Sequence, residues 1–404
     1  MGLLARLFGR EQRAASVKTS DPYLSEFLGM RDAMSGAAVS SERAGGLAVA
    51  YRCIQVRAEG LASVPLKLYR RAGDAREPAT DHPLYGVLHD RFNDGMTAFE
   101  GRELLSAWAD LYGNAFARIE SNGRGQVVAL YPMAPGAVTV EKLASGRLRY
   151  RWQPPNGSSQ VVLADEMLHI RHRSRDGALG VSPIAWARES VGLALAEQEH
   201  AASALRNGLR LSGAFTFPTS LNDEQFKRLR LSAEQKFSGP ANAGRFLVLD
   251  GGADFKPFSM SPKDAEFLES RKLSDLAICR LFGVPPTVAG ITDNATYSNT
   301  EQEGTALVVR CLAPWARRFE QVMTQALLTA NGRTSLFIEH DLSGLLRGDV
   351  KSRYEAYAVG RQWGWLSPND IRRLENMGPI ADGDVYHAPL NMAPLGAPAA
   401  TGGA

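Results

Sequence analysis

Histidine is the side chain most able to bind metals or transfer protons near neutral pH, so the histidines are the first candidates for chemistry. The candidates are His82, His89, His169, His172 and His200. His169 and His172 stand three apart in a predicted strand, so their side chains should point to opposite faces and cannot bind one ion together. No cysteine pair accompanies them, and the metalloprotease pattern His-Glu-x-x-His is absent. We therefore expect no metal site, a half-buried His169 and a solvated His172.

The patterns of hydrolases and motors are also missing. A serine hydrolase places its nucleophile in Gly-x-Ser-x-Gly, whereas the nearest match, around Ser182, continues into proline. A nucleotide-driven motor needs a loop ending in Gly-Lys-Ser/Thr, and the sequence has no Gly-Lys pair. Close carboxylates, Glu266 with Glu269 and Glu301 with Glu303, lie near predicted helix starts, where the helix dipole already favours them. We expect no catalytic residues and no cofactor; an enzyme whose site the sequence hides is the alternative.

The composition is typical of a soluble globular protein, with 404 residues of which 44% are hydrophobic and 22% charged. The net charge of +3 is close to balance, so contact with nucleic acid would have to come from local patches. Cys53, Cys279 and Cys311 have no paired spacing. This favours three buried thiols in a reducing compartment over a disulfide or a metal role.

The two ends of the chain differ from its middle. The apolar run in residues 1–10 is too short for a secretory signal, and no window reaches the roughly 18 apolar residues of a membrane span. We expect synthesis in the cytosol, no membrane association, and an N-terminal arm over residues 1–40. Residues 381–404, which end in a stretch rich in Ala, Pro and Gly, should form a flexible tail.

Two helices with clear start and stop signals occupy the centre of the chain. Ser182 is a good N-cap, and Pro183 suits a first helical turn, where its missing N–H has no partner to lose. Asn207-Gly208 supplies a stop. The alanines between them would let other helices approach closely, although an ordinary buried helix is the plainer interpretation. The sequence predicts a helix over residues 182–208.

The second of these helices is predicted over residues 261–286. It starts at Ser261-Pro262, and Gly283 followed by Val-Pro-Pro forbids continuation. Its second half is apolar nearly all round, which indicates neighbours on every side.

The remaining segments predict an α+β fold with a mostly antiparallel sheet. Before the first central helix, we expect helices at 41–62 and 97–111 and strands at 66–70, 115–120, 126–131, 138–140, 148–152, 161–163 and 167–172. Between the central helices, we expect strands at 213–217, 245–249 and 255–258 and a helix at 221–237. A polar loop then leads to a long helix from Thr300, kinked at Pro314, followed by a strand at 335–339 and helices at 349–363 and 369–376.

Four short motifs carry a family resemblance. Leu179-Gly-Val-Ser-Pro-Ile184, Asn207-Gly208, Leu281-Phe-Gly-Val-Pro-Pro286 and Tyr297-Ser-Asn-Thr-Glu301 occur in this order. Each motif mainly marks the start or end of a helix, but the order and separation of the four motifs together are specific for one family. Over about residues 40–379 the chain resembles the portal proteins of tailed bacteriophages, of the type of roughly this length found in long-tailed phages, prophages and gene-transfer agents.

The resemblance implies a portal fold with a β-rich wing, a helical stem, a small α/β clip insertion, a kinked long helix and a helical crown. The implied parts are the wing at 41–181 and 300–346, the stem helices at 182–208 and 261–286, the clip at 209–260, the tunnel loop at 287–299 and the crown at 347–380. It also implies a twelve-membered ring at one capsid vertex, through which double-stranded DNA is packaged and released. The implied partners are the large terminase, a head-tail adaptor and the major capsid protein, with assembly in the host cytoplasm.

DNA that slides needs weak, sequence-blind contacts, because dense Lys and Arg contacts would hold the duplex through counterion release. The tunnel loop offers suitable hydroxyls and amides at Asn294, Thr296, Tyr297, Ser298 and Asn299. The clip offers a basic surface at Lys227, Arg228, Arg230, Lys236 and Arg245. A plain solvated loop and surface are the alternative interpretations. For the whole chain, the alternative is a capsid scaffold or interaction protein without a conduit.

Overall fold

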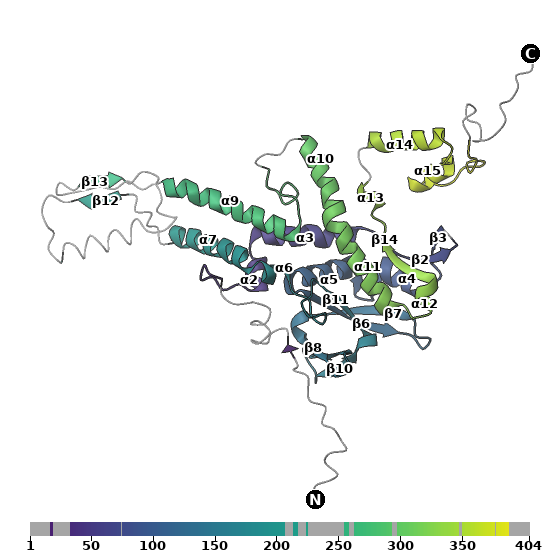
Figure 1. Cartoon of the computed structure of the whole chain (residues 1–404), viewed down its shortest axis with the longest axis horizontal. Helices are drawn as coiled ribbons and strands as arrows, with labels where there is room; N and C mark the ends of the chain where they lie inside the picture. The colour runs from purple at the N-terminus through teal and green to yellow at the C-terminus, as the bar shows by residue number, and fades with distance from the viewer. Residues whose placement is uncertain are drawn as a thin grey trace, which may run out of the picture. The chain divides into compact units, whose positions relative to one another are not determined.

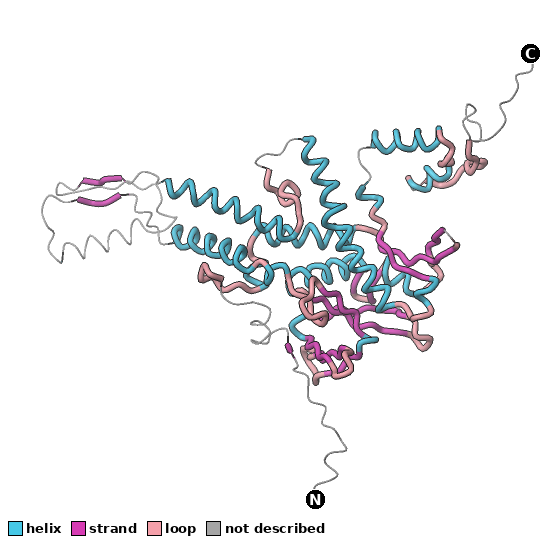
Figure 2. The backbone as a smooth tube through the Cα atoms, in the orientation of Figure 1, coloured by secondary structure: helices cyan, strands magenta, loops and turns pink. Residues whose placement is uncertain are grey.

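The computed structural model describes residues 17–18, 33–73, 75–206, 213–216, 224, 254–257, 262–292, 297–346, 350–375 and 377–387. The chain divides into two compact units, residues 1–341 and 342–404. The first unit combines small sheets with long helices, and the second is helical (Figure 1; Figure 2). The predicted α+β class is confirmed.

Short antiparallel sheets form the β-rich part of the first unit. The strands are β1 (Val17–Lys18), β2 (Leu66–Ala72), β3 (Ala75–Pro78), β4 (Arg91–Asn93), β5 (Met96–Thr97), β6 (Asn114–Ser121), β7 (Val127–Met133), β8 (Val138–Lys142), β9 (Leu148–Trp152), β10 (Gln160–Leu163), β11 (Met167–Arg171) and β14 (Leu336–His340). They pair in the orders β1-β8-β9-β10, β11-β6-β7, β14-β2-β3 and β4-β5. Every strand predicted in this region is present to within two residues at either end.

The helices of the first unit include both central helices. They are α2 (Ser41–Gly45), α3 (Ala48–Ser63), α4 (Pro83–His89), α5 (Ala98–Tyr112), α6 (Pro183–Trp186), α7 (Arg188–Arg206), α9 (Pro262–Phe282), α10 (Tyr297–Ala306), α11 (Ala313–Leu327) and α12 (Gly332–Ser335). The prediction of a single helix at 41–62 is wrong, because the helix is interrupted between α2 and α3. Gly46 closes α2 through its backbone N–H, and Leu47 is extended before α3 begins.

The first central helix is also interrupted. Ser182 caps α6, its hydroxyl accepting from the Ala185 N–H at 3.1 Å, and Pro183 is the first helical residue, both as predicted. However, Ala187 leaves helical geometry (φ −107°, ψ 35°), so α6 and α7 are separate. The short α6 contributes to two hydrophobic clusters, because Ile184 packs into a helical cluster and Ala185 packs into a sheet cluster.

The long helix after the polar loop differs from prediction in two ways. It begins at Tyr297, three residues before the predicted Thr300. The capping signals in this polar run do not select one start, because first-turn N–H groups need no intrahelical partner. A π-helical turn (Leu307–Leu312) joins α10 to α11 ahead of Pro314. Wider i→i+5 bonding avoids the clash of proline with the carbonyl four residues earlier.

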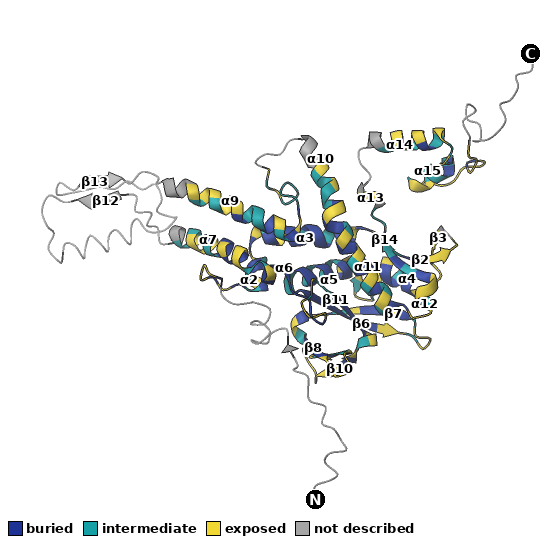
Figure 3. Ribbon diagram, in the orientation of Figure 1, coloured by how far each residue is buried: buried dark blue, intermediate teal, exposed yellow. Residues whose placement is uncertain are grey.

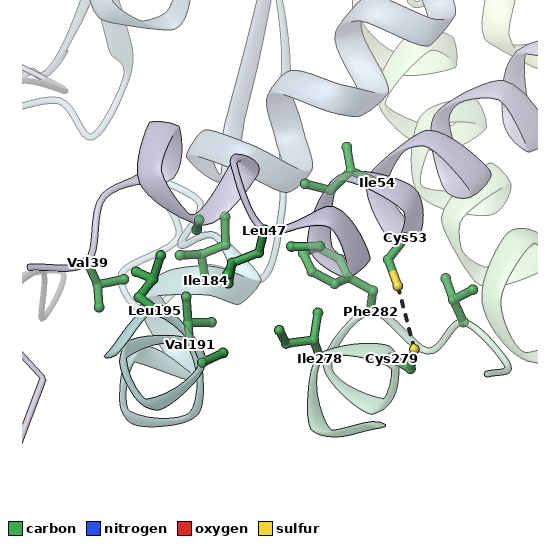
Figure 4. Close-up of a cluster of buried hydrophobic side chains, with 14 of the residues drawn as sticks. Val39, Leu47, Cys53, Ile54, Ile184, Val191, Leu195, Ile278, Cys279 and Phe282 are labelled. Carbon is green, nitrogen blue, oxygen red and sulfur yellow. Dashed lines mark hydrogen bonds between the residues drawn. The ribbon is translucent and has the colours of Figure 1, made fainter. Parts of the chain in front are cut away.

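The core of the first unit consists of two clusters. The helical cluster gathers residues of α2, α3, α7 and α9, among them Ile54, Val191, Ile278 and Phe282 (Figure 4). The sheet cluster gathers Phe116 and its neighbours on β6 to β11. Figure 3 shows buried residues concentrated where these elements meet and exposed residues along the outer faces of α7 and α9.

Part of the predicted insertion lies outside the described residues. β12 (Gly213–Thr216) and β13 (Asp254–Pro257) are present close to the predicted positions, and they pair antiparallel, which was not predicted. The strand predicted at 245–249 and the helix at 221–237 are not described, apart from Glu224, which is helical.

The second unit contains α13 (Ser343–Leu346), α14 (Val350–Gln362) and α15 (Pro368–Leu374). Ser367 and Asp370 form a capping box at the start of α15. Arg353 and Tyr357 of α14 both reach the carboxylate of Glu375, at 2.7 and 2.9 Å. The predicted helical pair is confirmed.

Gly101 in α5 provides a test of the packing. Alanine normally stabilises a helix interior relative to glycine by roughly 0.5–1 kcal/mol, but a Cβ at Gly101 would lie 2.1 Å from Phe92 Cδ2. We expect Gly101→Ala to lower the free energy of unfolding by about 1–3 kcal/mol in urea denaturation. Gly304→Ala in α10, where a Cβ meets nothing within 4 Å, is the control and should be neutral or stabilising. Equal effects of the two changes would contradict this packing.

Candidate channel and assembly elements

The predicted site residues fall into three groups in the structure. Ser182 and Pro183 cap α6, Pro262 opens α9 and Gly283 ends it. Tyr297, Ser298 and Asn299 form the first turn of α10 instead of the predicted loop. Outside the described residues lie Ser261, Asn294, Thr296 and the clip residues Lys227, Arg228, Arg230, Lys236 and Arg245.

The two central helices α7 and α9 lie side by side (Figure 1). Glu197 of α7 accepts a hydrogen bond from the Ser270 hydroxyl of α9 at 2.6 Å. The ring of His200 meets that of Phe267 edge-on, with centroids 5.6 Å apart. A polar and an aromatic contact thus join the middle of the pair, next to the apolar cluster that holds Val191 and Ile278.

The C-terminus of α9 is fixed by backbone geometry and by α3. Gly283 adopts φ +70°, and the Val284 N–H reaches back to the Cys279 carbonyl at 3.0 Å, which closes the helix in a Schellman turn. The Phe282 carbonyl accepts from Arg57 Nη1 at 2.8 Å and from the Cys311 thiol at 3.5 Å. Three helical segments therefore meet at one carbonyl.

Arg57 is also one half of a buried ion pair. Its Nε lies 3.0 Å from Asp110 Oδ2, and its guanidinium stacks 4.7 Å from the centre of the Trp315 ring. Asp110 is completely buried, and within the described residues neither of its oxygens has a hydrogen bond of good geometry. Burial raises the pKa of Asp110 to about 6, although the charge of Arg57 opposes the rise. Removing either partner would leave an uncompensated charge in the core.

The segment that follows α9 is a structured turn. The amides of Val288 and Ala289 bond to the Pro285 carbonyl, and the Ile291 amide bonds to that of Pro286. The Thr287 hydroxyl donates to the carboxylate of Glu303 in α10. Residues 287–292, the first part of the predicted tunnel loop, are thus bonded to the turn that ends α9 and to α10.

The histidines do not form a site. His82 caps α4, and His169 is fully buried, its Nε2 donating to Asn114 Oδ1 and its Nδ1 accepting from the Tyr150 hydroxyl. Burial lowers the pKa of His169 well below its usual value. The predicted half-buried setting of His169 is therefore wrong. Among the described residues, no group of three or more His, Cys, Asp or Glu is placed to hold a metal ion.

The prediction that His172 is solvated is wrong. Its side chain is 18% exposed, its Nε2 lies 3.7 Å from Asp110 Oδ1, and its ring lies 5.1 Å from that of Trp315. Burial, together with the charges of Arg57 and Arg318, lowers the pKa of His172 to about 3. The end of β11 is held against α11, because Arg318 donates hydrogen bonds to the carbonyls of residues 171 and 172.

The three cysteines are buried and free, as expected. Cys53 and Cys279 face one another across the α3–α9 contact, with their sulfurs 3.9 Å apart (Figure 4). No helix in the described part of the chain has the length and apolar character of a membrane span.

The residues that sequence reasoning missed are buried ionic ones. Arg57, Arg102 and Asp110 lie on predicted helices and look like ordinary surface charges. Arg102 binds the carbonyls of Ala62 and Val64, thereby capping the end of α3. The burial of Arg57 could have been inferred from its position, because it lies on the same helix face as the apolar residues Cys53 and Leu61.

This part of the chain thus presents helices that are anchored to one another at the C-terminus of α9. The profile of the family described as phage portal protein matches residues 48–376. The chain belongs to this family.

Individual relatives agree. The chain is 28% identical over 367 residues to the portal protein of Enterobacteria phage HK97, a match that covers 90% of this chain and 86% of the phage protein. It is 29% identical over 415 residues to the probable portal protein of Streptomyces phage phiC31, covering 98% and 90%. A chain in the neck of a native gene transfer agent particle, computed with C12 symmetry, shares the fold with a TM-score of 0.61 and 24% identity, covering 93% of this chain and 99% of that one.

Replacing His172 with glutamine tests its buried, neutral state. Because the folded-state pKa is about 3 and the usual value is 6.5, the unfolded chain binds a proton in this interval that the folded chain does not. The contribution of His172 to stability is therefore present above pH 6.5 and lost as the pH falls. Relative to H172Q, the wild-type free energy of unfolding should drop by about 2 kcal/mol from pH 7.5 to pH 5 in urea titrations. A difference that does not vary with pH would rule out this setting.

Proposed function

We propose that this chain forms an oligomeric ring at one capsid vertex and serves there as the conduit for packaging and release of double-stranded DNA. Membership of the phage portal protein family carries the proposal. The fold shared with a particle neck computed with C12 symmetry supports a twelve-membered ring. The role is structural, and the particle's portal vertex is its location after assembly in the host cytoplasm.

In this proposal α7 and α9 are the stem, and copies of the pair stand side by side around the channel. Their outer faces carry large exposed apolar side chains, namely Leu193 at 47%, Leu268 at 57% and Leu273 at 56% exposure. Packing against a second copy would remove these side chains from water. The second half of α9, predicted to have neighbours on every side, fits the same arrangement.

The remaining parts take the roles implied by the family. The β-rich region with α10 and α11 is the wing, residues 209–260 the clip, residues 287–299 the tunnel loop and residues 347–380 the crown. The clip faces the large terminase during packaging and the head-tail adaptor afterwards, and the wing contacts the major capsid protein. The polar loop and first turn of α10, including Asn294, Tyr297 and Asn299, touch DNA weakly so that it can slide.

Ring formation is the direct test of this function. Purified protein at increasing concentration should give annular particles in negative-stain images and a mass of about twelve subunits by light scattering. A protein that stays monomeric at high concentration, or assembles without a central opening, would favour a scaffold without a conduit.

The tunnel loop can be tested apart from assembly. Ile291 packs against the helical cluster and Tyr297 starts α10, so the change should be confined to residues 293–296, replaced by four glycines. We expect rings to form normally while the DNA content of particles falls severalfold, because the loop contacts that hold or guide the duplex are lost. The same replacement at Pro155–Ser158, an exposed turn between β9 and β10, is the control. Unchanged DNA content in the loop variant would refute this role.

A further inference from the structure

A small polar hollow of about 230 Å³ lies where α7 and α9 meet the start of α3. The turn at residues 46–49 forms one wall, and Glu197 of α7 forms another. Arg271, Ser274 and Asp275 of α9 complete it. The hollow is separate from the Arg57–Asp110 pair and from the predicted tunnel loop.

Glu197 is incompletely paired in this hollow. Only 7% of the residue is exposed, and Oε1 accepts from the Ser270 hydroxyl at 2.6 Å. Its other oxygen, Oε2, is buried without a hydrogen-bond partner in the described part of the chain. A buried carboxylate oxygen without a donor is costly, so the site lacks a donor that a partner could supply.

The charges around the hollow indicate which donor fits. Glu197 and Asp275 provide two carboxylates against the single guanidinium of Arg271, a balance of 1 − 2 = −1. Burial raises the pKa of Asp275, Arg271 opposes the rise and Glu197 adds to it, so the two carboxylates interact. The start of α3 lies on the same hollow, and its dipole favours ionised carboxylates. A cationic donor would neutralise the site.

We propose that a lysine or arginine of a second copy of this chain enters the hollow and donates to Glu197 Oε2. The inference rests on the ring assembly proposed above. In a ring, each subunit presents one surface to the copy before it and a different surface to the copy after it. A protein cation fits better than a metal ion, because the described residues offer no third acidic, His or Cys ligand there.

The test compares Glu197→Gln with Glu269→Gln, which removes an exposed carboxylate from α9. The amide of E197Q can still accept from Ser270 but carries no charge for the neighbour's cation. We expect the concentration of half-assembly, measured by mass photometry, to rise about tenfold or more for E197Q. The urea midpoint of the isolated subunit should stay equal or rise, because an unpaired buried charge has been removed. E269Q should change neither quantity.

Each other outcome has a distinct meaning. If wild type forms rings and E197Q assembles equally well, this inference fails while the ring stands; if wild type forms no rings, the proposed function fails. Loss of subunit stability in E197Q in step with loss of assembly would show a merely structural carboxylate and overturn the inference. Should E197Q fail to fold, Asp275→Asn takes its place with the same readouts. Dissociation of wild-type rings by a chelator, or a density map of the ring with only water beside Oε2, would also overturn it.

Discussion

The interaction on which the described core depends is the set of contacts made by the buried guanidinium of Arg57. From α3 it reaches the last carbonyl of α9, the carboxylate of Asp110 on α5 and the face of Trp315 on α11. A buried charge is costly unless a counter-charge lies close to it, and Asp110 Oδ2 lies 3.0 Å from Arg57 Nε. The Arg57 side chain thus links four helices, α3, α5, α9 and α11, near the C-terminus of α9.

The contacts of Arg57 add to the apolar packing of α7 and α9. The helical cluster around Ile278 and Phe282 includes the N-terminal part of α7 and the C-terminal part of α9. Farther from this cluster, the two helices are joined by a hydrogen bond and an aromatic contact. Beyond this cluster, α7 and α9 carry the exposed Leu193 and Leu268 and the incompletely paired Glu197. Such surfaces suit a subunit whose packing is completed by its neighbours.

The region around Arg57 connects the stem to the segment proposed to meet DNA. The Schellman turn at Gly283 redirects the chain, and Thr287 ties the following turn to Glu303 of α10. The π-helical turn then passes the chain into α11, where Trp315 returns to Arg57. The chain on both sides of the proposed DNA-contacting segment is therefore attached to the elements that surround Arg57.

Local signals in the sequence determined the capped start at Ser182, the end of α9 at Gly283, the antiparallel strands and the helical pair of the second unit, because these depend on residues close in the chain. The order of four punctuation motifs was enough to indicate the family. Only the tertiary structure decided that Ala187 interrupts the first stem helix, that β14 joins β2, and that Arg57, Asp110 and His172 are buried together. The pairing of β14 and the buried ionic group depend on partners distant in sequence, which periodicity and capping rules cannot identify. A charged residue on a helix looks the same whether its face meets water or an ion partner from another helix.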